Sequence, residues 1–98
     1  MVDVLLLWSK SDDPGAQAEA ISRLMGIMKA APGLQRLRVS EGDLMARGGP
    51  PPWSRVIEAS FGSLADWMAH VDVLNSQPDL AADRVERPMV VFFEARDA

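Results

Sequence analysis

The chain has 98 residues, a formal net charge of −4 and no cysteine. This length predicts a single domain over residues 1–98. No basic stripe is available to neutralise phosphates, so we expect neither nucleic acid nor an acidic membrane as a partner. The lack of cysteine excludes a disulfide scaffold, an iron–sulfur cluster and a thiolate nucleophile, and a single histidine excludes a multi-histidine metal site.

The first residues, MVDVLLLWSK, predict a strand and no targeting segment. The apolar run follows Asp3 instead of a basic region and is too short for a signal peptide or a membrane span. We therefore expect a cytoplasmic protein. The strand covers residues 2–8 and is apolar on both faces, as in a sheet that is covered on both sides. One face carries Val2, Val4, Leu6 and Trp8, and the other carries Leu5 and Leu7.

A helix is predicted for residues 16–30, after a loop in which Asp12 or Asp13 can cap it and Pro14 suits its first turn. Its apolar stripe is Ile21, Leu24, Met25 and Met28, and Gln17, Glu19, Arg23 and Lys29 are expected to face water.

Residues 34–41 alternate strictly and predict a strand at the edge of a sheet. Leu37 and Val39 form the dry face. Arg36 and Arg38 lie on the polar face, where Leu34 also falls in this register. The following residues, 42–52, read GDLMARGGPPP and predict a rigid connector. Leu44 and Met45 are apolar within it, so we expect them to contact another part of the protein.

The period changes within residues 53–74, from two in a predicted strand (53–61) to that of an amphipathic helix (64–74). Gly62 allows the turn, and Ser63 is placed to cap the helix. The predicted apolar stripe of the helix is Leu64, Trp67, Met68, Val71 and Leu74.

Residues 75–88 predict a polar return with a helical turn near Leu80–Asp83, and residues 89–95 predict a last strand, apolar on both faces. The order strand, helix, strand, strand, helix, strand predicts an α+β fold, the ferredoxin-like βαββαβ sandwich. Its four-stranded antiparallel sheet has the first and third strands at the centre and both helices on one face.

Two helices cover only one face of such a sheet, although the first and last strands carry large apolar residues on both. If it were left uncovered, the second face would be an apolar patch of roughly several hundred Å², which is more than soluble monomers usually expose. We therefore expect a homodimer through the open sheet face.

Three segments resemble the dimeric α/β-barrel superfamily, and most closely its EthD-like branch. They are APGLQRLRVS (residues 31–40), EASFGSLADWMAHV (58–71) and PDLAADRVERPMVVFFEA (78–95). The resemblance implies a dimer with a ligand cleft between sheet and helices. It also implies chemistry without a cofactor, since the superfamily includes cofactor-free monooxygenases, polyketide cyclases and lactone isomerases. Its members often carry a histidine on the first helix, but residues 24–28 here are LMGIM, so that role cannot be transferred.

His70 is the only imidazole, and Asp66 lies one helical turn before it. Two interpretations stay open: His70 is a general base oriented by Asp66, or it belongs to a solvated local pair at the edge of the core. Glu58 lies in the predicted third strand. It can pair across strands with Arg38 or Arg36, or act as an acid with a raised pKa.

The aromatic and methionine side chains either fill the core or line a pocket for an apolar ligand. No phosphate-binding glycine loop, nucleophile elbow or metal-ligand spacing is present, so we expect neither a metal nor a cofactor. Three functions remain open: an enzyme acting on a small aromatic or polyketide-like molecule, a non-catalytic binder, or a dimerisation module. The candidate ligand-binding residues are Trp67, Trp8, Phe61, Met25 and Met28.

Overall fold

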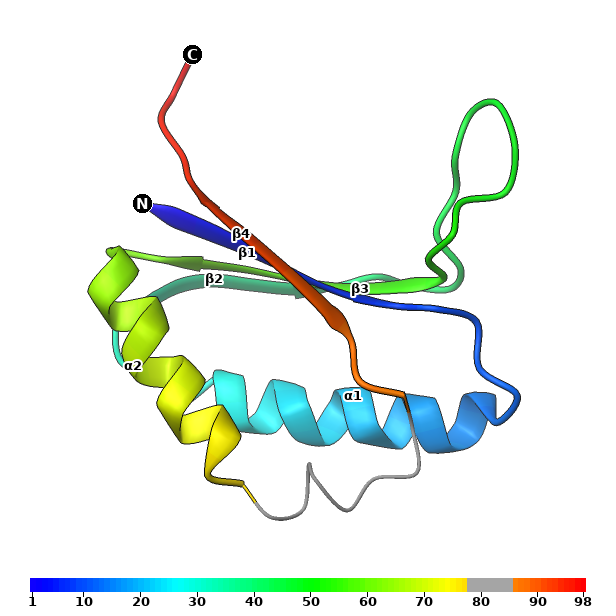
Figure 1. Cartoon of the computed structure of the whole chain (residues 1–98), viewed down its shortest axis with the longest axis horizontal. Coiled ribbons are helices and arrows are strands. Elements are labelled where there is room, and N and C mark those ends of the chain that lie inside the picture. Colours follow the sequence, from blue (N-terminus) through cyan, green and yellow to red (C-terminus); the bar gives the residue numbers. More distant parts are fainter. Residues whose placement is uncertain (78–85) are drawn as a thin grey trace.

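The computed structural model describes residues 1–77 and 86–98. Four strands form one antiparallel sheet in the order β2-β3-β1-β4, and both helices lie on the same face of it (Figure 1). The predicted ferredoxin-like fold, with the first and third strands at the centre, is therefore confirmed. The helical turn predicted near Leu80–Asp83 lies outside the described residues. The elements are β1 (Val2–Trp8), α1 (Pro14–Met28), β2 (Leu34–Val39), β3 (Arg55–Phe61), α2 (Leu64–Asn75) and β4 (Met89–Glu94).

The core lies between the two central strands and the helices. β1 shows the alternation that its sequence predicts, with every second residue buried from Val2 to Trp8. On β3, Ile57, Ala59 and Phe61 are fully buried. Burial of one such large apolar side chain contributes about 1.5–3 kcal/mol, so this helix-facing layer supplies most of the stability. The helices complete the layer with Ala20, Ile21, Leu24, Met28 and Trp67.

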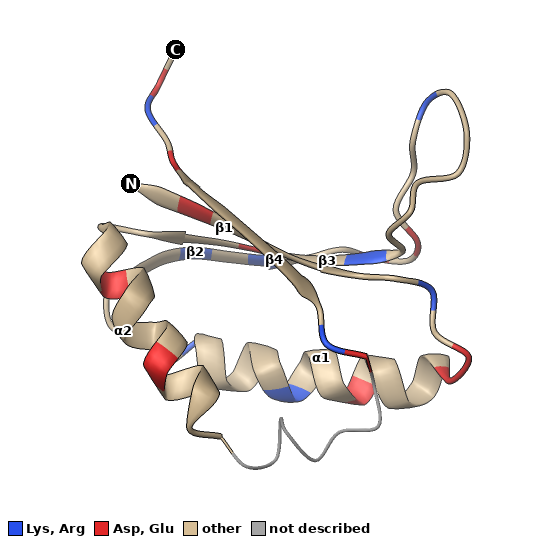
Figure 2. Ribbon diagram, in the orientation of Figure 1, with Lys and Arg blue, Asp and Glu red and all other residues tan. Residues whose placement is uncertain are grey.

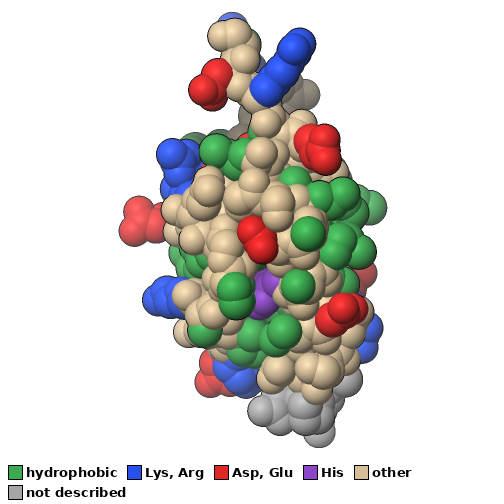
Figure 3. Space-filling model, turned by 90° about the vertical axis from the view of Figure 1, so that its left-hand side faces the viewer, with side chains coloured by type: hydrophobic (Ala, Val, Ile, Leu, Met, Phe, Trp, Pro, Cys, Tyr) green, Lys and Arg blue, Asp and Glu red, His purple; other side chains and the backbone are tan. Residues whose placement is uncertain are grey.

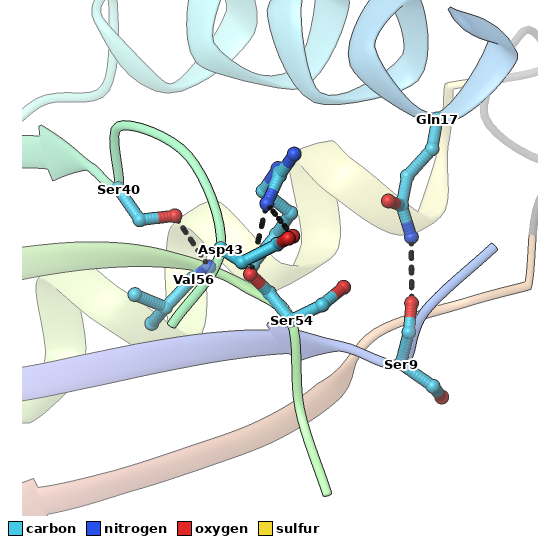
Figure 4. Close-up of polar contacts among 7 residues, drawn as sticks. Ser9, Gln17, Ser40, Asp43, Ser54 and Val56 are labelled. Atoms are coloured by element: carbon cyan, nitrogen blue, oxygen red, sulfur yellow. Dashed lines mark hydrogen bonds and ion pairs between the residues drawn. The ribbon is translucent and has the colours of Figure 1, made fainter. Parts of the chain in front are cut away.

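Helix α1 begins two residues earlier than predicted because Asp13 caps it. Its Oδ1 accepts a hydrogen bond of 3.0 Å from the Ala16 N–H, and Pro14 occupies the first turn. The expectation that Gln17 faces water is wrong, since this residue is only 6% exposed. Its Nε2 donates to the Ser9 carbonyl oxygen at 2.9 Å (Figure 4), which satisfies the buried amide and ties the helix start to the end of β1.

Helix α2 is capped as predicted, with the Ser63 Oγ accepting from the Asp66 N–H at 3.1 Å. Its buried face is rotated relative to the predicted stripe. Leu64 and Met68 are 41% and 47% exposed, whereas Trp67 and His70 are 1% and 3% exposed. His70 therefore occupies the centre of the buried face and is not a residue of its edge.

The edge position of β2 is confirmed, but Leu34 faces the core and not the polar side. The pairing with β3 shifts register between Leu34 and Arg36, so one extra residue interrupts the alternation. Both Leu34 and Leu37 pack against the core from this edge.

Residues 42–54, here called the β2–β3 arm, rise from the sheet on the side opposite the helices (Figure 1). Four contacts fix the base of the arm, and Figure 4 shows two of them, the ion pair of Asp43 and the hydrogen bond between Ser40 and Val56. The Leu44 N–H bonds the Ser54 carbonyl at 3.0 Å, and the Ser54 N–H bonds the Trp8 carbonyl at 2.7 Å. Arg55 pairs with Asp43, and the Val56 N–H donates to the Ser40 Oγ at 3.1 Å.

The open face of the sheet is divided into a polar and an apolar half. Figure 2 shows the charged residues of the sheet on β2, β3 and the start of β1, while β4 is almost free of charge. On the apolar half, Leu5 lies opposite Val91 and Leu7 opposite Met89. In this single chain Met89, Val91 and Phe93 are 51%, 40% and 49% exposed, so the face has no cover within the described residues. The apolar half, here called the apolar strip, consists of Leu5, Leu7, Val56, Met89, Val91 and Phe93.

Candidate functional site

A cavity of about 510 Å³ opens between the helices and the β1–β4 side of the sheet. It forms because β4 is an edge strand whose helix-facing residues, Val90 and Phe92, are 44% and 46% exposed, so the helices do not cover them. The wall is mainly apolar. Its polar groups lie at the end of α2 and in the residues just before β4. Apolar lining residues include Leu6, Trp8, Leu24, Trp67, Val71 and Phe92, and polar ones Asn75, Gln77, Glu86 and Arg87.

Trp67 is the centre of an aromatic cluster beside this cavity. Its ring centroid lies 5.9 Å from that of Phe92 on β4, 5.4 Å from that of Phe61 on β3 and 6.3 Å from that of His70. Such tilted pairs contribute about 0.5–1.5 kcal/mol each beyond their buried area. Trp67 thus lines the cavity and also lies beside His70, which does not line it.

His70 is buried against Phe61, with ring centroids 5.7 Å apart. Figure 3 shows the imidazole in a gap between hydrophobic side chains. Burial lowers the pKa of His70 below its ordinary value of 6.5 because it disfavours the charged imidazolium, so the neutral form prevails at pH 7. Among the described residues, neither His70 Nε2 nor Trp67 Nε1 has a hydrogen-bond partner, although both atoms are buried.

Asp66 lies beside Gly33 at the turn into β2, so close that a Cβ on that glycine would collide with the Asp66 carboxylate. Gly33 has a φ of +83°, which a side chain there would strain. This tight turn brings the Gly33 carbonyl within 3.0 Å of the Gly62 N–H and so joins the ends of β2 and β3. Within the described chain no hydrogen bond links Asp66 to His70, so the structure does not join the expected acid–base pair.

Glu58 lies on the other face of the sheet. It is opposite Arg38 in the β2–β3 register, and the Arg38 Nε–H donates to its Oε1 at 2.9 Å. The cross-strand pair is therefore the alternative that the structure shows. Nearby, the Ser60 hydroxyl donates to the Asp3 Oδ1 at 2.7 Å. The sheet separates Glu58 from both the cavity and His70.

Of the five residues predicted to bind a ligand, Trp8 and Trp67 line the cavity. The other three do not line it: Phe61 and Met28 are fully buried, and Met25 is partly buried and packs against the core. Sequence reasoning missed Phe92 as a lining residue, although it lies in a strand that is apolar on both faces, and such a strand has a contact surface on each face.

Residues 1–77 and 86–98 contain no group of three side chains suited to hold a metal ion. In the same residues, no helix has the length and apolar character needed to cross a membrane.

No protein-family model and no curated protein matches the sequence. Among solved structures, an EthD family protein from Bacillus halodurans aligns over 98% of this chain and 99% of its own, with a TM-score of 0.69 and 13% identity. A dimeric ferredoxin-like protein of unknown function from Thermobifida fusca aligns over 96% and 90%, with a TM-score of 0.69 and 19% identity.

A third similar structure is SnoaB, a cofactor-independent oxygenase from Streptomyces nogalater. It aligns over 99% of this chain and 93% of its own, with a TM-score of 0.62 and 16% identity. At sequence identities this low, the similarity shows a shared fold and does not assign a shared function. The chain has the ferredoxin-like fold of EthD-like proteins, as the resemblance of its sequence predicts.

Proposed function

We propose that this protein is a homodimer that binds a small, largely apolar molecule of aromatic or polyketide-like shape in the cavity beside Trp67. The observation that carries this proposal is the cavity itself, whose volume of about 510 Å³ is that of a small-molecule site. Its walls offer the faces and edges of Trp8, Trp67 and Phe92, which suit a flat ring system.

The polar groups in the wall support a ligand that carries polar substituents at one end. Asn75 and Gln77 offer amides that donate and accept hydrogen bonds, and Glu86 and Arg87 offer opposite charges. A few polar groups in an apolar pocket orient a ligand. The similarity to a cofactor-independent oxygenase agrees with a site that needs no metal or bound cofactor.

The homodimer follows from the apolar strip. A two-fold contact places the same surface on both sides, so the apolar strip of one copy meets that of the other. The Thermobifida fusca protein and a structurally similar protein from Jannaschia are both described as dimeric. The sheets of the two copies then form a closed interior with the helices outside.

Blocking the cavity tests the binding site. We expect Val71→Trp to weaken binding of 8-anilinonaphthalene-1-sulfonate, an aromatic probe, because the indole occupies part of the cavity that Val71 lines. The matched control is Val73→Trp, which places the same ring at a position 44% exposed on α2 that does not line the cavity. Fluorescence titration of the dimer should show at least about tenfold weaker binding for the first variant only. Equal binding by both variants would contradict the site.

A second function, transformation of the bound molecule with His70 as general base, is favoured by one observation. His70 is neutral, and its Nε2 is buried without a hydrogen-bond partner in the described structure. Proton transfer to a molecule in the cavity requires Trp67 to move, because His70 does not line the cavity and its ring lies beside that of Trp67, which does. Asp66 would orient the imidazole only after a comparable movement, and Glu58 has no part in it.

Mass spectrometry of the gently purified dimer identifies any retained molecule, which then serves as the substrate to test for base catalysis. We expect its turnover to fall by about 100-fold or more in His70→Gln, the range of a lost general base, while binding of the anilinonaphthalene probe is unchanged. Turnover that survives this substitution would leave the protein as a binder. A protein without a retained molecule or probe binding would be a dimerisation module.

A further inference from the structure

The β2–β3 arm has no evident use within its own protomer. Met45, a large apolar residue of the arm, is 96% exposed, more than any other large apolar side chain of the described residues. The arm rises on the open side of the sheet, and the C-terminal residues leave the sheet on the same side at its other end (Figure 1). The apolar strip thus lies between two projecting segments.

The arm is built to hold its direction. The ladder bond between Leu44 and Ser54 and the ion pair between Asp43 and Arg55 join its two sides at the base. Ser54 is also bonded to the end of β1. Further out, Pro50, Pro51 and Pro52 restrict the returning side to an extended form. An exposed methionine on such a support is presented to a partner at little cost in chain entropy.

The arm is long enough to reach beyond the spacing of two packed sheets. Its first five residues, 42–46, lead to the turn at 47–49 and span at most roughly 16–18 Å, whereas sheets that pack face to face lie about 10 Å apart. A segment that rises beyond the plane of contact must lie alongside the second copy. Two-fold symmetry then gives two arms, one from each protomer, that enclose the dimer from opposite sides.

We infer that the β2–β3 arm is a clasp that places Met45 against the flank of the second protomer. This inference rests on the proposed homodimer and adds a second contact area to the apolar strip. The adaptable thioether side chain suits a contact with the irregular edge of a neighbouring subunit. It also accounts for the apolar residue in an otherwise turn-like run of sequence.

The absence of cysteine makes a direct test possible. Met45→Cys carries the only thiol of the chain and can be labelled with a benzophenone maleimide, then irradiated as a mixture of ¹⁴N and ¹⁵N protein. We expect covalent dimers whose cross-linked peptides join light to heavy chains. The control is Glu19→Cys, an exposed position on α1 that faces away from the open sheet and should give no more than background dimer.

The outcomes separate the clasp from the dimer. Native mass spectrometry that shows a dimer, with Met45→Cys labels attached only within their own chain, would overturn the clasp and keep the dimer. A monomer in native mass spectrometry would overturn both. Met45→Ala gives a second measurement: sedimentation equilibrium should show dimerisation weakened about tenfold, the scale of one well-packed interface side chain. An unchanged dissociation constant would also contradict the clasp.

Discussion

Val91→Glu should convert the protein from a dimer into a folded monomer. Val91 lies in the middle of the apolar strip, opposite Leu5, so a contact between two open faces buries it. Burial of an unpaired carboxylate costs at least about 3 kcal/mol, which weakens association by roughly 100-fold or more. Within the protomer the substitution is mild, because Val91 lies on an edge strand and is 40% exposed.

Light scattering during size-exclusion chromatography measures this change, with far-UV circular dichroism as the check on folding. Val73→Glu is the matched control because it makes the same replacement at a residue 44% exposed on α2, away from the sheet. This control should remain dimeric. If Val91→Glu also stays dimeric while folded, the two copies associate through another surface and the closed interior is wrong.

The sheet was predictable because its evidence is local. Strand β1 alternates along its own sequence, and the pairing of Arg38 with Glu58 follows from two neighbouring strands in a simple register. The same local reasoning failed at Leu34, where the register shift turns a side chain onto the other face. Nothing in the alternating pattern of residues 34–41 marks that position.

The site was harder to predict because its parts come from distant segments. The buried face of α2 was predicted from the most apolar residues of the helix. In the structure, the contacts of Trp67 with Phe61 on β3 and Phe92 on β4 determine which side of the helix is buried. With these contacts, Trp67 and His70 are buried and Met68 is exposed. The cavity depends on how far α1 and α2 extend over β4. The position of the helices relative to β4 leaves no periodic pattern in the sequence from which it could be predicted.

Trp67→Ala should be the most destabilising of the changes considered. The indole is 1% exposed and contacts three other rings, so its removal leaves a large cavity at the junction of α2, β3 and β4. Such truncations cost about 3–5 kcal/mol, a large part of the 5–15 kcal/mol that stabilises a typical domain. Trp53→Ala should cost less than half as much, since Trp53 is only half-buried and lies outside the core cluster.

Urea unfolding at one fixed protein concentration measures the stability of both variants, because dimerisation would otherwise shift the apparent stability.

Trp67→Ala should also change the titration of His70. In the native protein the pKa of His70 is lowered by burial, so its contribution to stability is complete above the unfolded value of 6.5 and is lost as the pH falls below it. Without the indole, water reaches the imidazole, and its pKa should return towards 6.5, as followed by NMR of the ring protons. A pKa that stays low in folded Trp67→Ala would mean that Phe61 and the helix alone bury His70, and that Trp67 does not shield it from water.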